Sequence, residues 1–82
     1  MDFLLVEERV IVEAKMTRPG LGDKRLGAQL TLDLASYQKR GDCDFLVFFV
    51  YDPARRLKNP SGLRKDLISA VKNLRLFVEF VS

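Results

Sequence analysis

The stretch Asp2-Phe-Leu-Leu-Val-Glu-Glu-Arg-Val-Ile-Val-Glu-Ala-Lys15 holds two short apolar runs that flank the polar pair Glu7-Glu8. β-Branched and large apolar side chains favour strands, and a short polar break between two such runs is typical of a tight hairpin. A loop centred on Glu7-Glu8 pairs residues that lie at equal distances from it, which places Asp2 opposite Glu13. We therefore expect this stretch to form an antiparallel hairpin.

Three charged side chains are expected to converge on this hairpin. Directly opposed residues have Cβ atoms about 5 Å apart, so the like charges of Asp2 and Glu13 destabilise the sheet. Alternation along the strand places Lys15 on the same face as Glu13. Mg²⁺ prefers oxygen ligands, and a nearby lysine can orient or deprotonate a metal-bound water. The pattern therefore suits metal-assisted hydrolysis, and the alternative is a solvated strand face with a weak ion pair.

The same residues carry a resemblance to a known family. Asp2 followed by Glu13-Ala14-Lys15 resembles the PD-(D/E)XK signature of the restriction-endonuclease-like nuclease superfamily, although Met1 stands where a proline usually precedes the first acid. The segment Val12–Arg18, the Gly-rich loop and helix after it, and the strand Phe45–Tyr51 are similar to the C-terminal half of a type II restriction-endonuclease domain. The resemblance covers nearly the whole chain.

The resemblance implies a Mg²⁺ site in which Mn²⁺ can substitute. Asp2, Glu13 and the backbone carbonyl of Ala14 would hold the metal, and Lys15 would position the attacking water. In related nucleases a glutamine on the helix after the catalytic strand often faces the metal site. Gln29 is therefore assigned a catalytic role.

Residues Lys24 to Lys39 have the spacing of an amphipathic helix. Its apolar stripe contains Leu26, Leu30, Leu34 and Tyr37. Asp23 is a plausible N-cap and Gly41 a C-terminal stop, while Gln29 and Asp33 lie on an adjoining face. Tyr37 either packs in the core or points along the same groove as Gln29.

Two more elements complete the predicted sheet. The segment Asp44–Tyr51 is apolar between its ends, which is typical of a central parallel strand covered on both faces. A short helix is expected from about Leu63 to Asn73, with Ser61 as its N-cap, followed by a strand over 74–81. The fold class is therefore α/β, with a mixed sheet of about four strands in the order β-hairpin, helix, strand, helix, strand. The resemblance implies that this is a restriction-endonuclease-like core lacking its N-terminal helix.

Basic residues gather in the loop after the hairpin and in the loop after the central strand. Lys24 and Arg25 stand in the first turn of a helix, where cations oppose the helix dipole, so another purpose is expected for them. Contact with DNA phosphates is that purpose, and simple solvation is the alternative. The predicted nucleic-acid-binding residues are Arg18, Lys24, Arg25, Arg55, Arg56 and Lys58.

The amino-acid composition limits the kinds of site that the chain can form. The net charge is +3, from 14 Lys and Arg against 11 Asp and Glu, which is a weak indication of a polyanionic partner. The single cysteine, Cys43, excludes an intramolecular disulfide and a multi-cysteine zinc site, and the absence of histidine removes the commonest general base. No segment has the apolar length of a membrane span, and no signal-peptide pattern is present, so we expect a cytoplasmic protein without a membrane partner.

We expect one restriction-endonuclease-like domain over residues 1–82, in a truncated or a minimal form, because the superfamily core usually starts with a helix and a further strand. Without those elements an apolar sheet surface or strand edge would face water, which predicts a homo-oligomer. Two functions stay open at this point. One is metal-dependent hydrolysis of DNA phosphodiester bonds by an endonuclease. The other is a catalytically inactive remnant that binds nucleic acid or mediates oligomerisation.

Overall fold

The computed structural model describes residues 2–5 and 7–82, with only the backbone described for residues 2 and 3. Its elements are β1 (Asp2–Leu5), β2 (Val10–Met16), α1 (Asp23–Arg40), β3 (Phe45–Tyr51), α2 (Pro60–Ala70) and β4 (Arg75–Val81). The predicted α/β class and element order are confirmed. None of the helices in these residues is long and apolar enough to cross a lipid bilayer.

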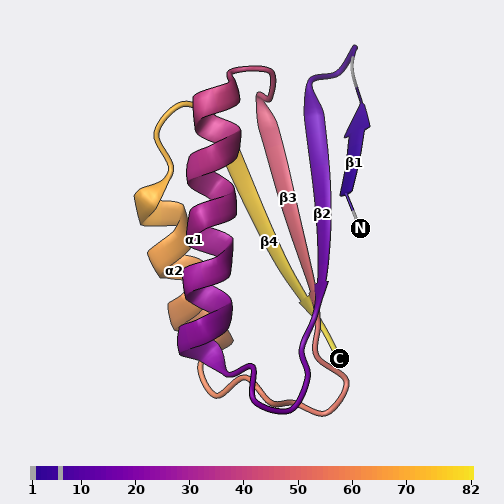
Figure 1. Cartoon of the computed structure of the whole chain (residues 1–82), viewed down its shortest axis with the longest axis vertical. Coiled ribbons are helices and arrows are strands. Elements are labelled where there is room, and N and C mark those ends of the chain that lie inside the picture. The colour runs from indigo at the N-terminus through magenta and orange to yellow at the C-terminus, as the bar shows by residue number, and fades with distance from the viewer. Residues whose placement is uncertain (1, 6) are drawn as a thin grey trace.

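The four strands form one mixed sheet in the order β1-β2-β3-β4 (Figure 1). β1 and β2 are antiparallel, and their register places Asp2 opposite Glu13, as the hairpin pattern predicted. β2, β3 and β4 are parallel to one another, so β2 and β3 end together at Met16 and Tyr51. The loops that follow these two strands therefore leave the same edge of the sheet.

Both helices pack on one face of the sheet (Figure 1). Parallel crossovers are right-handed in about 98% of cases, and β2, β3 and β4 follow one another in a single direction, so α1 and α2 fall on the same side. The core between helices and sheet contains Ile11, Leu26, Leu30, Leu34, Leu46, Phe48, Val50, Leu63, Leu67 and Val78. Burying each such side chain stabilises the fold by about 1.5–3 kcal/mol.

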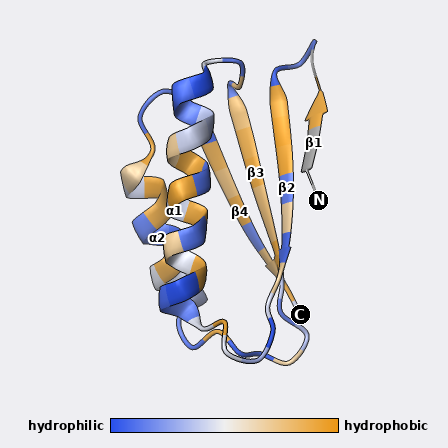
Figure 2. Ribbon diagram, in the orientation of Figure 1, coloured by the Kyte–Doolittle hydropathy of each residue, from blue (hydrophilic) through white to orange (hydrophobic). Residues whose placement is uncertain are grey.

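The opposite face of the sheet is apolar and uncovered in the part of the chain that the structure describes. On β3, Phe49 and Tyr51 are 41% and 47% exposed, and Phe77 on β4 is 50% exposed. The prediction that β3 is covered on both faces is therefore wrong. Its apolar composition reflects one buried face and one open face, and Figure 2 shows the resulting hydrophobic strands.

The helix starts differ from the sequence-based expectation. α1 begins at Asp23 itself, with Gly22 as the N-cap and no side-chain cap. α2 begins at Pro60, earlier than expected, and its N-cap is Asn59, whose Oδ1 accepts a hydrogen bond from the N–H of Gly62. Asn59 rather than Ser61 caps this helix because Pro60 already fits the first helical position.

Candidate active site

Glu13 lies near the middle of β2 on the helix-covered face of the sheet, and only 4% of its surface is exposed. The hydroxyl of Tyr37, on α1, donates a hydrogen bond of 3.1 Å to Glu13 Oε1. Glu13 Oε2 is buried as well, yet it has no hydrogen-bond donor. Buried carboxylates are normally paired or bound to a metal, so this half-satisfied group is unusual.

Lys15 shares this face of β2 and contacts the same helix. Its Nζ lies 3.5 Å from Oδ2 of Asp33 on α1, and both side chains are about one-third exposed. Asp33 and Tyr37 are one helical turn apart and so face the same side. The predicted approach of Lys15 to Glu13 on one face is therefore found, and α1 adds Asp33 and Tyr37 to the cluster.

The electrostatics of Glu13 follow from this setting. Burial raises the pKa of Glu13 to about 7, and the neighbouring carboxylate of Asp33 adds to the rise. The Tyr37 hydroxyl and the Lys15 ammonium act in the opposite direction and favour the ionised form. Near neutral pH the carboxyl is therefore poised between its two protonation states.

The loop after β3 is held against the loop after β2 by Asp52, which is buried. Its Oδ1 accepts hydrogen bonds from the Thr17 hydroxyl at 2.7 Å and from the N–H of Arg56 at 2.8 Å. Its Oδ2 accepts from the N–H of Leu57 at 3.0 Å. This carboxylate fixes the path of the segment that carries Arg55 and Arg56.

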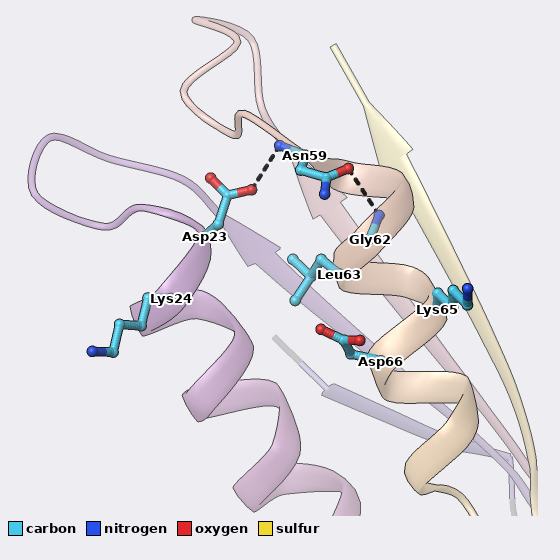
Figure 3. Close-up of a pocket in the computed structure, with 7 residues that line it drawn as sticks. All are labelled: Asp23, Lys24, Asn59, Gly62, Leu63, Lys65 and Asp66. Atoms are coloured by element: carbon cyan, nitrogen blue, oxygen red, sulfur yellow. Dashed lines mark hydrogen bonds between the residues drawn. The ribbon is translucent and has the colours of Figure 1, made fainter.

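Asp23 holds the other end of the same loop. Its two carboxylate oxygens accept hydrogen bonds from the N–H groups of Lys58 and Asn59, both at 2.8 Å. Figure 3 shows this carboxylate reaching from α1 towards the start of α2. It borders an open depression of about 430 Å³ that is also lined by Lys24 and Lys65.

The basic residues predicted to bind nucleic acid are thus brought to one end of the molecule. Lys24 and Arg25 follow the β2 loop, and Lys58 is joined to them through Asp23. The six side chains, which are all exposed, are Arg18, Lys24, Arg25, Arg55, Arg56 and Lys58. Because β2 and β3 end at this edge, the basic loops leave the sheet just beyond the strand position of Lys15.

The family of the chain can now be stated. The family model described as REase DpnII-MboI matches residues 1–80. The chain belongs to the DpnII-MboI family of restriction endonucleases. This is a type II restriction endonuclease family of the PD-(D/E)XK-like kind, so the predicted resemblance is confirmed. No curated protein sequence and no solved structure matches the chain.

The remaining predicted site residues of this DpnII-MboI member are placed as follows. The Asp2 backbone pairs with Glu13, while its side chain lies outside the described residues. Ala14 lies between Glu13 and Lys15 on β2, with its side chain on the open face. Gln29 is half-buried on α1, one turn before Asp33. Asp33 and Tyr37 of α1 make polar contacts with Lys15 and Glu13 of β2.

Sequence reasoning noted Asp33 on the same helix face as Gln29 but gave it no role. The signal was present, because Asp33 lies midway between Gln29 and Tyr37 at intervals of four residues. The sequence does not reveal how α1 is rotated about its own axis relative to β2. That rotation decides which of these side chains reaches Glu13 and Lys15 on β2.

The residues present fit a divalent cation, which restriction endonucleases of this kind use. Glu13 Oε2 and Asp33 Oδ2 are buried oxygens without a hydrogen-bond donor, and Mg²⁺ favours carboxylate oxygens. Among the described residues, no group of three or more acidic, cysteine or histidine side chains is placed to hold a metal ion, at Glu13 or at any other position. Glu13 is the centre on which a cation site would be built.

Proposed function

We propose that this chain is a Mg²⁺-dependent endonuclease that hydrolyses DNA phosphodiester bonds, with Mn²⁺ as an effective substitute. The observation that carries the proposal is the buried Glu13 beside Lys15, with Oε2 of Glu13 left without a donor in a member of a DNA-cleaving family. Asp2, Glu13 and the Ala14 carbonyl would hold the cation. When bound, it would polarise the scissile phosphate and lower the pKa of a water molecule.

Each neighbouring residue has a defined task in this proposal. Tyr37 fixes the orientation of Glu13 by its hydrogen bond to Oε1. Lys15 positions the attacking water, and its ammonium, held in place by Asp33, stabilises the negative charge that develops as the water attacks. Gln29, on the same side of α1, would contact the water or the phosphate.

DNA would bind at the end of the molecule where the loops after β2 and β3 emerge. Arg55 and Arg56 are carried by a loop that Asp52 fixes before any ligand is bound, so little conformational entropy is lost on binding. Phosphate contacts from the basic loops would orient the duplex, and their number would set the salt dependence of binding. Lysine or arginine contacts of this kind supply affinity rather than sequence recognition.

We further propose that the chain self-associates through the open face of the sheet. The exposed apolar side chains on this face include Met16, Phe49, Tyr51, Phe77 and Val81. On β4, Arg75 and Glu79 flank Phe77 with opposite charges, so a two-fold axis near Phe77 would pair each arginine with the partner's glutamate. The free edge of β4 is less suited to pairing, because Arg64 Nε already donates to the Val78 carbonyl there at 3.0 Å.

Sedimentation velocity at micromolar concentration tests this interface. We expect a homodimer or higher oligomer for the wild type and a monomer for Phe77→Lys. Leu32→Lys is the matched control, because Leu32 is 71% exposed on the outer side of α1 and lies off the open face. A monomeric wild type, or equal dissociation of both variants, would contradict the interface.

A catalytically inactive nucleic-acid-binding or oligomerisation module is the second candidate. It is favoured by the engagement of Lys15 with Asp33 and by the raised pKa of Glu13, which leaves part of the population without a carboxylate at neutral pH. Under either candidate we place the chain in the cytoplasm, where the buried free thiol of Cys43 remains reduced.

Cleavage of supercoiled plasmid separates the two candidates. The wild type should nick DNA in Mg²⁺ or Mn²⁺ and stop on addition of EDTA, and Glu13→Gln and Lys15→Ala should both lose this activity. Glu8→Gln and Lys39→Ala are the matched controls, because both residues are exposed and remote from the cluster. Equal cleavage by all four folded variants would place the activity in another residue set or in a contaminant.

A further inference from the structure

Among the described residues, three buried carboxylate oxygens lack a hydrogen-bond donor: Oε2 of Glu13 on β2, Oδ2 of Asp33 on α1 and Oδ1 of Asp42. Asp42 lies in the loop after α1, where its other oxygen pairs with Arg40, whereas Glu13 and Asp33 lie on facing elements. Both are acceptors, so neither can satisfy the other while both groups are ionised. A protein interior rarely leaves such atoms unpaired, because each lost hydrogen bond to water reduces folding stability. Glu13 is bonded to Tyr37 of α1 and Asp33 is paired with Lys15 of β2, so both side chains lie where β2 faces α1.

The two carboxyl groups are close neighbours. Burial raises the pKa of Glu13, and the nearby charge of Asp33 adds to the rise, which is consistent with two carboxyl groups close to one another. Lys15 Nζ lies 3.5 Å from Asp33 Oδ2, which is longer than a charge-assisted hydrogen bond. The lysine therefore offsets part of the negative charge without supplying the missing donor.

Tyr37 settles which oxygen of Glu13 is available. Its hydroxyl occupies Oε1, and it stands one helical turn from Asp33 on α1. Glu13 is thus held with one oxygen satisfied and the other left for a ligand. A side chain anchored in this way loses little freedom when it binds a cation.

We propose that Asp33 is a ligand of the same divalent cation as Glu13, so that the site is assembled between β2 and α1 rather than on the hairpin alone. The inference rests on the proposed function and adds one residue to it. The positive charge of the cation would offset the repulsion between the two carboxylates. Two carboxylates, water and a substrate phosphate satisfy the oxygen preference of Mg²⁺.

A merely positioning role for Asp33 makes a different prediction. If Asp33 acted only through its contact with Lys15, then removing its charge would change catalysis and leave cation binding intact. A ligand role predicts instead that replacing Asp33 lowers the affinity for the cation, whether or not Lys15 is present. Binding can therefore distinguish the two without measuring activity.

Calorimetric titration of the full chain with Mn²⁺ at pH 8 tests the proposal. We expect Asp33→Asn to weaken Mn²⁺ binding by at least about tenfold, because even the loss of an outer-shell partner of a metal site costs roughly 10–100-fold in affinity. Glu13→Gln should weaken it at least as much. Asp66→Asn, the same substitution at an exposed position of α2, should bind as the wild type does, and Lys15→Met should retain binding.

Thermal melting without added metal shows whether each variant is folded. Asp33→Asn removes a like charge beside Glu13, so its melting temperature should match or exceed that of the wild type, and Asp33→Ser provides a second variant. Wild-type affinity in both folded Asp33 variants, together with loss of binding in Glu13→Gln, would overturn the ligand role and leave the proposed function standing. Absence of any Mn²⁺ binding by the wild type would overturn both.

Discussion

The molecule contains two sets of partly or fully buried carboxylates that the fold treats in opposite ways. Asp52 and Asp23 receive three and two hydrogen bonds, and their pKa values lie below the ordinary value. For Asp52, burial alone would raise the pKa, but the Thr17 hydroxyl and the backbone N–H groups outweigh it. Glu13 and Asp33 each keep an oxygen without a donor, and the pKa of Glu13 is raised to about 7.

The difference follows from where each carboxylate stands. Loop 52–59 has N–H groups that are not committed to a helix or sheet, and Asp52 and Asp23 collect them. Glu13 lies within a strand that is paired on both sides, so its neighbouring N–H groups belong to the sheet ladder. Only side chains can donate hydrogen bonds to Glu13 there, and α1 places the Tyr37 hydroxyl and the Asp33 carboxylate beside it. Asp52 and Asp23, which receive several hydrogen bonds, form the donor-rich set and maintain the fold. Glu13 and Asp33, which each keep an oxygen without a donor, form the donor-poor set and are the candidates for chemistry.

The largest expected effect is on catalysis at the donor-poor centre. Lys15→Ala should lower the rate of Mg²⁺-dependent plasmid cleavage by roughly 10²–10³-fold, the usual contribution of one positioned group that stabilises charge in the transition state. Its melting temperature should change little, because the partly exposed Lys15–Asp33 pair contributes only about 0–1 kcal/mol. If Lys15→Ala lowered the melting temperature markedly as well as the cleavage rate, Lys15 would have a structural role. That result would contradict the assignment of chemistry to the donor-poor set.

The largest effect on stability is expected at the donor-rich set. Asp52→Ala leaves the Thr17 hydroxyl and the N–H groups of Arg56 and Leu57 without their acceptor, which should cost roughly 2–4 kcal/mol of unfolding free energy. Urea denaturation measures this cost. Asp44→Ala is the control, because Asp44 forms an exposed pair with Arg9 and should cost less than about 1 kcal/mol.

The two sets should also respond oppositely to pH. The folded pKa of Glu13, about 7, lies above its ordinary value of 4.5, so the folded state holds a proton that the unfolded state has lost between these values. Stability should therefore fall as pH rises from about 4.5 to 7, by about 3 kcal/mol at most. Urea denaturation at pH 5 and pH 8 should show this fall in the wild type and not in Glu13→Gln.

The donor-rich set should lose stability only in acid. The pKa values of Asp23 and Asp52 are lowered from 3.8, so their contribution is present above that value and lost as pH falls below it. Asp23 and Asp52 therefore do not contribute to the change in stability that Glu13 is expected to cause between about pH 4.5 and pH 7. Stability that is independent of pH between 5 and 8 in the wild type would contradict the raised pKa of Glu13.

The smallest effect is expected at Asp23. Asp23→Asn keeps an acceptor oxygen but removes the charge that holds the N–H groups of Lys58 and Asn59, which should cost about 1 kcal/mol. Looser attachment of the basic loop should also weaken DNA binding a few-fold, as measured by fluorescence anisotropy at fixed salt. Asp66→Asn, at the edge of the same depression, should leave DNA affinity unchanged or slightly higher.

Most of the fold could be predicted from local sequence pattern. The two apolar runs around Glu7-Glu8 and the period of the apolar residues in α1 set the hairpin register and the buried helix stripe. The open face could not be predicted, because an apolar strand such as β3 looks the same whether one face or both are covered. Strand order and crossover handedness decide that, and neither is a property of one segment.

The candidate site was only partly predictable. Glu13 and Lys15 were found because period-two alternation fixes their common face. Asp33 was not assigned, since its approach to β2 depends on how α1 is rotated by the packing of Leu30 and Leu34. The roles of Asp23 and Asp52 in joining two loops depend on contacts between segments far apart in the chain, which no local pattern records.

The most direct test of the central claim is the single-turnover rate of supercoiled plasmid cleavage in Mg²⁺, compared among wild type, Glu13→Gln and Asp23→Asn. If the donor-poor carboxylates carry out the chemistry and the donor-rich ones maintain the fold, Glu13→Gln should be at least about 100-fold slower than wild type. The rate of Asp23→Asn should lie within a few-fold of the wild-type rate. Equal rates for wild type and Glu13→Gln, or equal losses in both folded variants, would contradict the claim.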